Sequence, residues 1–193
     1  MTTVFDIGAH IGLVTMPISS VLDPAGKVYA FEPAEANRGH LRDHLQKNAI
    51  RNVEIVASLV GDCNSEQVRF YEQSGATGQN ALAIKKNHHA YHETVRPQIT
   101  LDHFCASRKI LPDVIKIDVE GAELSVLRGA TKILKVSQPI IFLSVHPVEI
   151  SLLGSSIDEL ENVINALGYE CREMDGQPVA KFRLAEYQLL PRK

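Results

Sequence analysis

The sequence has few cysteines, no excess of positive charge and no long apolar run. Its three cysteines are scattered over 193 residues without a Cys-x-x-Cys pair, so we expect a reducing cytoplasm and neither a disulfide framework nor a zinc site. The net charge of −3 offers no basic surface, and neither a nucleic acid nor a membrane is expected as a partner. The apolar run from Ile140 to Val145 is far shorter than the ~20 residues that cross a bilayer. A strand is expected almost from Met1, which leaves no room for a signal peptide.

Internal repeats, low-complexity segments and interdomain linkers are also absent, so we expect a single domain over residues 1–193. Short apolar segments alternate with amphipathic ones, which predicts an α/β fold with a mostly parallel sheet and helices on both faces. The expected strands cover residues 4–7, 27–31, 53–60, 68–71, 99–101, 114–118, 139–145, 169–173 and 186–190. The expected helices cover residues 12–22, 34–47, 102–107, 122–134 and 157–167, the last opened by a capping box at Ser156 and Glu159.

The segment from Val4 to Gly12 carries the first functional signal. A short apolar strand ends in a turn bounded by Gly8 and Gly12, and the turn leads into a helix. Such a turn directs helix N-terminal amides into a crevice where an anionic group can bind. The dinucleotide fingerprint Gly-x-Gly-x-x-Gly has a middle glycine, but His10 stands at that position here. A pyrophosphate ligand, and with it a nicotinamide-dependent dehydrogenase, is therefore disfavoured, whereas a smaller nucleoside fits the pattern.

An acidic residue follows the second expected strand. Glu32 lies about 20 residues after the glycine turn, where a carboxylate accepts hydrogen bonds from the ribose hydroxyls of a bound nucleoside. The structural alternative is that Glu32 only caps the helix that begins at Pro33. Because the turn and the acid occur together, we favour the nucleoside.

Three pieces of the sequence resemble the FkbM family of S-adenosylmethionine-dependent methyltransferases. They are Val4 to Gly12, Val28 to Pro33 with Asn37 after it, and Ile115 to Glu123, and the similarity runs in the family's order from about Val4 to His146. The resemblance implies a Rossmann-like class I methyltransferase fold, with a seven-stranded sheet whose last strand is antiparallel. It also implies S-adenosyl-L-methionine as the cofactor and O-methylation of a hydroxylated small-molecule acceptor such as a sugar.

Polar residues follow most of the expected strands, and ligands of open α/β sheets bind beyond the carboxyl ends of the strands. We expect cofactor contacts from Asp6, Gly8, His10, Gly12, Glu32, Ser58 and Asp118. Ser58 is included because class I methyltransferases contact adenine after the third strand. Asp118 has a structural alternative, which is to cap the following helix.

Methyl transfer to a hydroxyl is an in-line displacement that also requires removal of a proton. His146, with an ordinary pKa of about 6.5, is the first candidate for the general base, and Glu120 is the second. His146 could instead only pack against Pro147. Asn80 and Glu123 are expected to contact the acceptor. For Asn80 a surface loop is an equal alternative, and a carboxylate such as Glu123 is favourable in a first helical turn without any function.

No metal site is expected. The alternative is that Asp118, Glu120 and His146 hold a divalent cation that orients a diol. His88 and His92 would share one face of a helix as a metal pair, but no acidic or cysteine ligand lies at a useful spacing, so a solvated loop is favoured there.

A function of a different class is also consistent with the sequence. The chain could be a catalytically weak or non-catalytic domain that keeps the fold and the cofactor, because little sequence precedes the first strand to cover a substrate. No motif identifies the acceptor or the oligomeric state.

Overall fold

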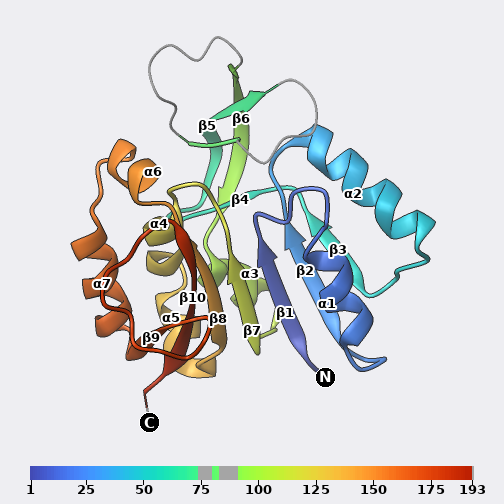
Figure 1. Ribbon diagram of the computed structural model, residues 1–193. Helices are drawn as coiled ribbons and strands as arrows, with labels where there is room; N and C mark the ends of the chain where they lie inside the picture. Colours follow the sequence, from blue (N-terminus) through green and yellow to red (C-terminus); the bar gives the residue numbers. More distant parts are fainter. Residues whose placement is uncertain (74–79, 83–90, 193) are drawn as a thin grey trace.

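The computed structural model describes residues 1–73, 80–82 and 91–192. Its main element is a seven-stranded sheet in the order β3-β2-β1-β7-β8-β10-β9 (Figure 1). The strands are β1 (Thr3–Ile7), β2 (Lys27–Phe31), β3 (Val53–Val56), β7 (Val114–Ile117), β8 (Ile140–Val145), β9 (Tyr169–Glu173) and β10 (Ala185–Pro191). The first five strands in this order are parallel, and β10 pairs antiparallel with both β8 and β9. The predicted mostly parallel sheet with an antiparallel last strand is therefore confirmed.

Helices cover both faces of the sheet, as the alternating pattern predicted. They are α1 (Thr15–Val21), α2 (Glu35–Lys47), α3 (Leu101–Arg108), α4 (Glu123–Arg128), α5 (Thr131–Ser137), α6 (Pro147–Leu152) and α7 (Ile157–Ala166). Side chains of α3, α4, α5 and α7 share the larger core with the sheet, and those of α1 and α2 pack into a smaller core on β2 and β3. No helix in the described part of the chain is long and apolar enough to cross a membrane.

Four aromatic rings fix the two strands that carry the glycine turn and Glu32. Phe5 of β1, Tyr29 and Phe31 of β2, and Phe104 of α3 meet edge to face, with ring centroids 4.9 Å apart for Phe31 and Phe104. Each such pair adds about 0.5–1.5 kcal/mol beyond the area that it buries. Successive residues of a strand point to opposite faces, so Asp6 turns away from this cluster toward α1.

A second, three-stranded sheet has the order β4-β6-β5. Its strands are β4 (Leu59–Val60), β5 (Ser65–Gln73) and β6 (Tyr91–Ile99), and the antiparallel pair β5–β6 extends beyond the carboxyl edge of the main sheet (Figure 1). An ion pair of 2.7 Å between Glu72 and Arg96 joins the two strands. Phe70 packs against Leu59 and Ala34 at the base of the pair, which brings the second sheet to the edge where ligands bind.

Two expected strands have different bounds from those predicted. The strand expected at 53–60 divides at Ser58, whose hydroxyl donates to the carbonyls of Leu59 and Pro97, and β4 then pairs with β6 rather than with the main sheet. The strand expected at 99–101 is the end of β6 followed by the start of α3, because Thr100 caps that helix by accepting from the His103 amide at 3.1 Å. Both differences arise from side-chain hydrogen bonds that a hydrophobic pattern does not encode.

The expected helix 122–134 is two helices, α4 and α5, which meet at Gly129. A Cβ at Gly129 would lie 1.9 Å from the carbonyl oxygen of Gly61. The backbone segments that contain Gly129 and Gly61 therefore lie too close together for a side chain at Gly129. The capping box of α7 is confirmed: Ser156 accepts from the Glu159 amide, and Glu159 accepts from the Ser156 amide.

Helix α1 begins at Thr15, three residues later than expected, which places Pro17 in the first turn, where a missing N–H is tolerated. The apolar side chains of Val14 and Val21 do not face the core: they are 41% and 81% exposed, whereas Thr15 and Ser19 are buried. The helix is oriented by the hydrogen bond from the Thr15 hydroxyl to Asp6, a polar contact that overrides the apolar stripe.

Helix α6, in the segment after His146, was not expected. Of the expected histidine loop at 87–92, residues 87–90 lie outside the described residues, His88 among them. His92 belongs to β6 rather than to a loop.

Candidate functional site

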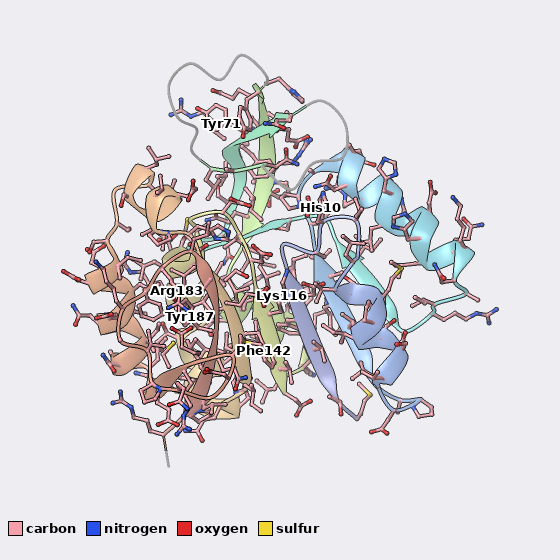
Figure 2. The ribbon with its side chains drawn as sticks, viewed as in Figure 1. His10, Tyr71, Lys116, Phe142, Arg183 and Tyr187 are labelled. Atoms are coloured by element: carbon pink, nitrogen blue, oxygen red, sulfur yellow. The ribbon has the colours of Figure 1, made fainter. Side chains whose placement is uncertain are left out.

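The turn between β1 and α1 crosses the end of β2. The amides of Gly8 and Ala9 both donate to the carbonyl of Phe31 at 3.0 Å. Gly8 has a φ of 82°, and a Cβ there would lie 1.8 Å from the carbonyl oxygen of Asp118, so only glycine fits between β1 and the residues that follow β7. His10 also has a positive φ, 53°, and lies at the carboxyl edge of the sheet (Figure 2).

Glu32 is buried where β2 ends, and three protein groups hold its carboxylate. Oε2 accepts from the His10 amide at 2.8 Å, and Oε1 accepts from the Ala34 amide at 2.9 Å and from Nδ2 of Asn37 at 3.2 Å. Burial raises the pKa of Glu32 above its ordinary value, although the three donors act in the opposite direction. Glu32 thus holds the backbone before α2, which agrees with the alternative that it caps this helix. It also holds the glycine turn at the end of β2 through the His10 amide.

A cavity of about 220 Å³ opens beside these residues, at the carboxyl ends of β1, β2 and β7. The expected site residues that line it are Gly8, His10, Glu32, Ser58, Asn80, Asp118 and Glu120. Lining residues that the sequence did not point to as site residues include Phe31, Asn37, Phe70, Leu82 and Val119. Asn37 had a signal, since it belongs to the second motif piece, whereas Phe70 of β5 and Leu82, in the segment between β5 and β6, had none.

Asp6 and Gly12 do not line the cavity. They support the glycine turn, which forms part of its wall. Asp6 is fully buried and accepts from the Thr15 hydroxyl at 2.5 Å, while Nζ of Lys116 lies 3.6 Å from its other oxygen. Gly12 faces Leu41 of α2, whose Cδ1 would lie 2.5 Å from an added Cβ. Both residues therefore position the turn through packing and hydrogen bonds.

A cluster of charged residues lies at the other end of the cavity. Asp118 and Glu120 follow β7, and His146 follows the neighbouring strand β8, so parallel pairing brings them together. Nδ1 of His146 lies 2.6 Å from Oε1 of Glu123. Nε2 of His146 lies 3.7 Å from Oδ1 of Asp118 and 3.9 Å from Oε1 of Glu120. Glu123 and His146 do not line the cavity themselves, and Glu123 is wholly buried.

The loop after β7 has an unusual backbone. Glu120 has a φ of 49°, and Gly121, with a φ of 104°, lies against Glu149 of α6, whose carbonyl carbon would be 2.6 Å from an added Cβ. This close approach of α6 fixes the backbone on which Glu120 is presented to the cavity.

The environment of the charged cluster raises the pKa values of His146 and Glu120. Burial lowers the pKa of His146, but the hydrogen bond to Glu123 and the charges of Glu123, Glu120 and Asp118 outweigh it, so the pKa lies above its ordinary value. Burial raises the pKa of Glu120. Lys116, whose Nζ lies 3.3 Å from Asp118, supplies a positive charge to the cluster; its sequence signal was a lysine inside an apolar strand.

The same residues could accept a divalent cation. Asp118, Glu120 and His146 each offer one ligand atom, and these atoms lie within 4.8 Å of one another. A mixed set of carboxylates and one imidazole suits several metals. The cation alternative raised by the sequence is therefore compatible with the geometry.

Comparison with known proteins identifies the family. The pattern of the FkbM methyltransferase domain matches residues 6–171. The chain belongs to the FkbM methyltransferase family. This match confirms the resemblance seen in the sequence and covers the glycine turn, Glu32 and the charged cluster.

Solved structures show the same Rossmann-like fold. The FkbM methyltransferase of Methylobacillus flagellatus KT superposes with a TM-score of 0.61 at 17% identity, over 97% of this chain and 43% of that one. A Streptococcus mutans protein solved in complex with S-adenosylhomocysteine superposes with a TM-score of 0.53 at 12% identity, over 98% of this chain and 86% of that one. The predicted class I methyltransferase fold is confirmed.

One curated relative is much longer than this chain. The AMB antimetabolite synthetase AmbE of Pseudomonas aeruginosa is 27% identical over 204 residues, which cover 86% of this chain and 9% of AmbE. The chain therefore spans less than a tenth of that relative.

Proposed function

We propose that the protein is an S-adenosylmethionine-dependent O-methyltransferase that acts on a hydroxylated small molecule such as a sugar. The observation that carries the proposal is a single cavity with two distinct ends. One end holds the buried carboxylate of Glu32, and the other is bounded by Asp118 and Glu120, beside His146. Membership of the FkbM family supports methyl transfer as the reaction class.

The residues around the cavity fit the cofactor. A carboxylate has about four lone-pair positions, and donors among the described residues use three at Glu32, which leaves one for a ribose hydroxyl. Phe70 and Leu82 give the same cavity an apolar wall suited to adenine. When bound, S-adenosylmethionine supplies an activated methyl group. The protein contributes the orientation of the acceptor and the removal of its proton.

The charged end favours a neutral acceptor with more than one hydroxyl group. Nε2 of His146 can accept the proton of the reacting hydroxyl, with Glu120 as the second candidate for this role. Asp118 and Glu120 can each accept a hydrogen bond from a neighbouring hydroxyl, and their negative charge disfavours an anionic acceptor. These features support a sugar or a related polyhydroxylated compound.

The proposal is tested by binding and turnover measured separately. Calorimetry should detect S-adenosylmethionine binding, and a panel of neutral polyhydroxylated acceptors with methyl-labelled cofactor should reveal transfer. His146→Asn should keep the cofactor affinity and lose turnover by about 10²–10⁴-fold, the usual contribution of a general base. The matched control is His103→Asn, at an exposed position on α3.

Full turnover in His146→Asn would remove His146 as the base. Tight cofactor binding without transfer to any acceptor would favour the non-catalytic alternative. A thermal shift with NAD and none with S-adenosylmethionine would refute the cofactor assignment.

A further inference from the structure

Glu123 has its carboxylate in the protein interior, where carboxylates are rare. It opens α4 and is wholly buried, a condition that charged side chains avoid unless they are paired. Its Oε1 accepts from the Gly121 amide at 3.1 Å and lies 2.6 Å from Nδ1 of His146. Its Oε2 has no hydrogen-bond partner among the described residues. Glu123 is thus committed to His146 and does not reach the cavity where an acceptor would bind.

We infer that Glu123 is a positioning residue that fixes His146 with a proton on Nδ1 and leaves Nε2 to act on the acceptor. The inference rests on the proposed O-methylation and replaces the expected acceptor contact of Glu123. In this step the acceptor O–H bond breaks and its proton passes to Nε2. The electron pair of the oxygen forms the new bond to the methyl carbon, and the sulfonium sulfur keeps the pair of the broken C–S bond.

The distances around the imidazole assign different roles to its two nitrogens. Nδ1 lies 2.6 Å from a buried carboxylate, the short separation of a charge-assisted hydrogen bond. Nε2 lies 3.7 and 3.9 Å from Asp118 and Glu120, beyond direct hydrogen bonding to either, and both residues line the cavity. Nδ1 therefore faces the buried carboxylate of Glu123, and Nε2 lies beside the two carboxylates of the cluster that line the cavity. A carboxylate that holds the first nitrogen also stabilises the imidazolium that forms when the second takes a proton.

Several charged groups surround His146 and contribute to its acidity. Asp118 and Glu120 follow β7, Glu123 lies on α4, and Glu149 of α6 acts on Glu120. Lys116 of β7 is paired with Asp118. Since the three nearest carboxylates all favour the protonated imidazole, removal of the charge of Glu123 alone should lower the pKa of His146 without abolishing its titration.

The first test needs neither acceptor nor cofactor. Nuclear magnetic resonance of the whole chain labelled with ¹⁵N at histidine reports the protonation of each ring nitrogen, and His146→Asn assigns the signal. We expect neutral His146 to carry its proton on Nδ1. A neutral form with the proton on Nε2 would overturn the inference, and this wild-type measurement does not depend on the folding of any substituted protein.

The second test removes the charge and keeps the shape. In Glu123→Gln the pKa of His146 should fall by about 1–3 units, the usual effect of an adjacent opposite charge. The acid limb of the kcat/KM profile should move to lower pH by the same amount, with a lower plateau and an unchanged affinity for S-adenosylmethionine. Glu149→Gln, which removes a nearby carboxylate that does not contact His146, should leave the tautomer unchanged.

Two further outcomes would overturn the inference. One is an unchanged pKa and tautomer of His146 in Glu123→Gln. The other is selective broadening of the Nε2 signal by micromolar Mn²⁺, because Nε2 would then be a metal ligand instead of the proton acceptor. Since both readouts are independent of turnover, a chain that transfers no methyl group would refute the proposed function and still leave the Glu123–His146 pair measurable.

Discussion

The two ends of the cavity are built differently. At the end formed by β1 and β2, the carboxylate of Glu32 accepts from neutral donors, two backbone amides and the side-chain amide of Asn37, while the Arg38 guanidinium donates to the backbone carbonyl of Glu32. At the end formed by β7 and β8, Asp118 and Glu120 lie near His146 at distances too long for direct hydrogen bonds. The first arrangement is rigid and suited to holding a ligand. The second retains charges and an uncommitted ring nitrogen, which suits the transfer of a proton.

Close backbone packing joins the two ends of the cavity. Gly8, in the turn that Glu32 holds, lies directly against the carbonyl of Asp118, at the start of the charged cluster. The sheet order makes this possible, because β1 lies between β2 and β7. The position of the ligand-holding turn and the position of the charged cluster are therefore linked through the backbone, by this approach and by the hydrogen bond of 3.0 Å that the Asp118 amide donates to the Ile7 carbonyl.

The largest effect is expected where this contact is broken. Gly8→Ala introduces a Cβ 1.8 Å from the carbonyl oxygen of Asp118 at a φ of 82°, so both strain and overpacking should lower the free energy of unfolding by about 2–5 kcal/mol. The matched control is Gly154→Ala, at a φ of 78° with no atom within 4 Å of the added Cβ. It should show only the conformational part, about 1–2 kcal/mol. Urea denaturation measures both, and equal losses would show that the approach of Gly8 to Asp118 is unimportant.

The next effect concerns the rigid end alone. Glu32→Ala removes the acceptor offered to the ribose and releases the His10 amide, so S-adenosylmethionine should bind about 10- to 150-fold more weakly, given about 1.5–3 kcal/mol for a hydrogen bond to a charged group. Glu35→Ala, at the first residue of α2 and outside the cavity lining, should bind normally. Calorimetry distinguishes the two, and unimpaired binding by Glu32→Ala would exclude the ribose role.

The difference between the ends also explains what the sequence could predict. The rigid end follows from local rules, a glycine turn after one strand and an acid after the next, and the cavity includes Gly8, His10 and Glu32 as expected. The contact between Glu123 and His146 joins residues 23 positions apart, and only the pairing of β7 with β8 brings them together. The sequence therefore indicated that both residues were candidates but assigned Glu123 to the acceptor.

The differences between the expected and observed elements have a related origin. The apolar wall at Phe70 and Leu82 depends on a second sheet that leaves the main sheet at Ser58, which a hydrophobic run through residues 53–60 concealed. The face of α1 is set by the hydrogen bond between Thr15 and Asp6. Side-chain hydrogen bonds of Ser58 and Thr15, rather than hydrophobic periodicity, decided these features.

The smallest effect should come from the pH dependence of the charged end. Because the pKa of His146 is raised above 6.5 in the folded chain, its protonated form stabilises the fold. This stabilisation is fully present below the unfolded value of about 6.5 and is lost as the pH rises through the higher folded-state pKa. From pH 6 to pH 9 the free energy of unfolding should therefore fall more in the wild-type chain than in His146→Asn, whereas exposed His103→Asn should follow the wild type. Urea denaturation across this range measures the change of the unfolding free energy with pH. Equal changes in the wild type and His146→Asn would mean that the carboxylates around His146 do not retain its proton. The two ends of the cavity would then differ in shape but not in charge.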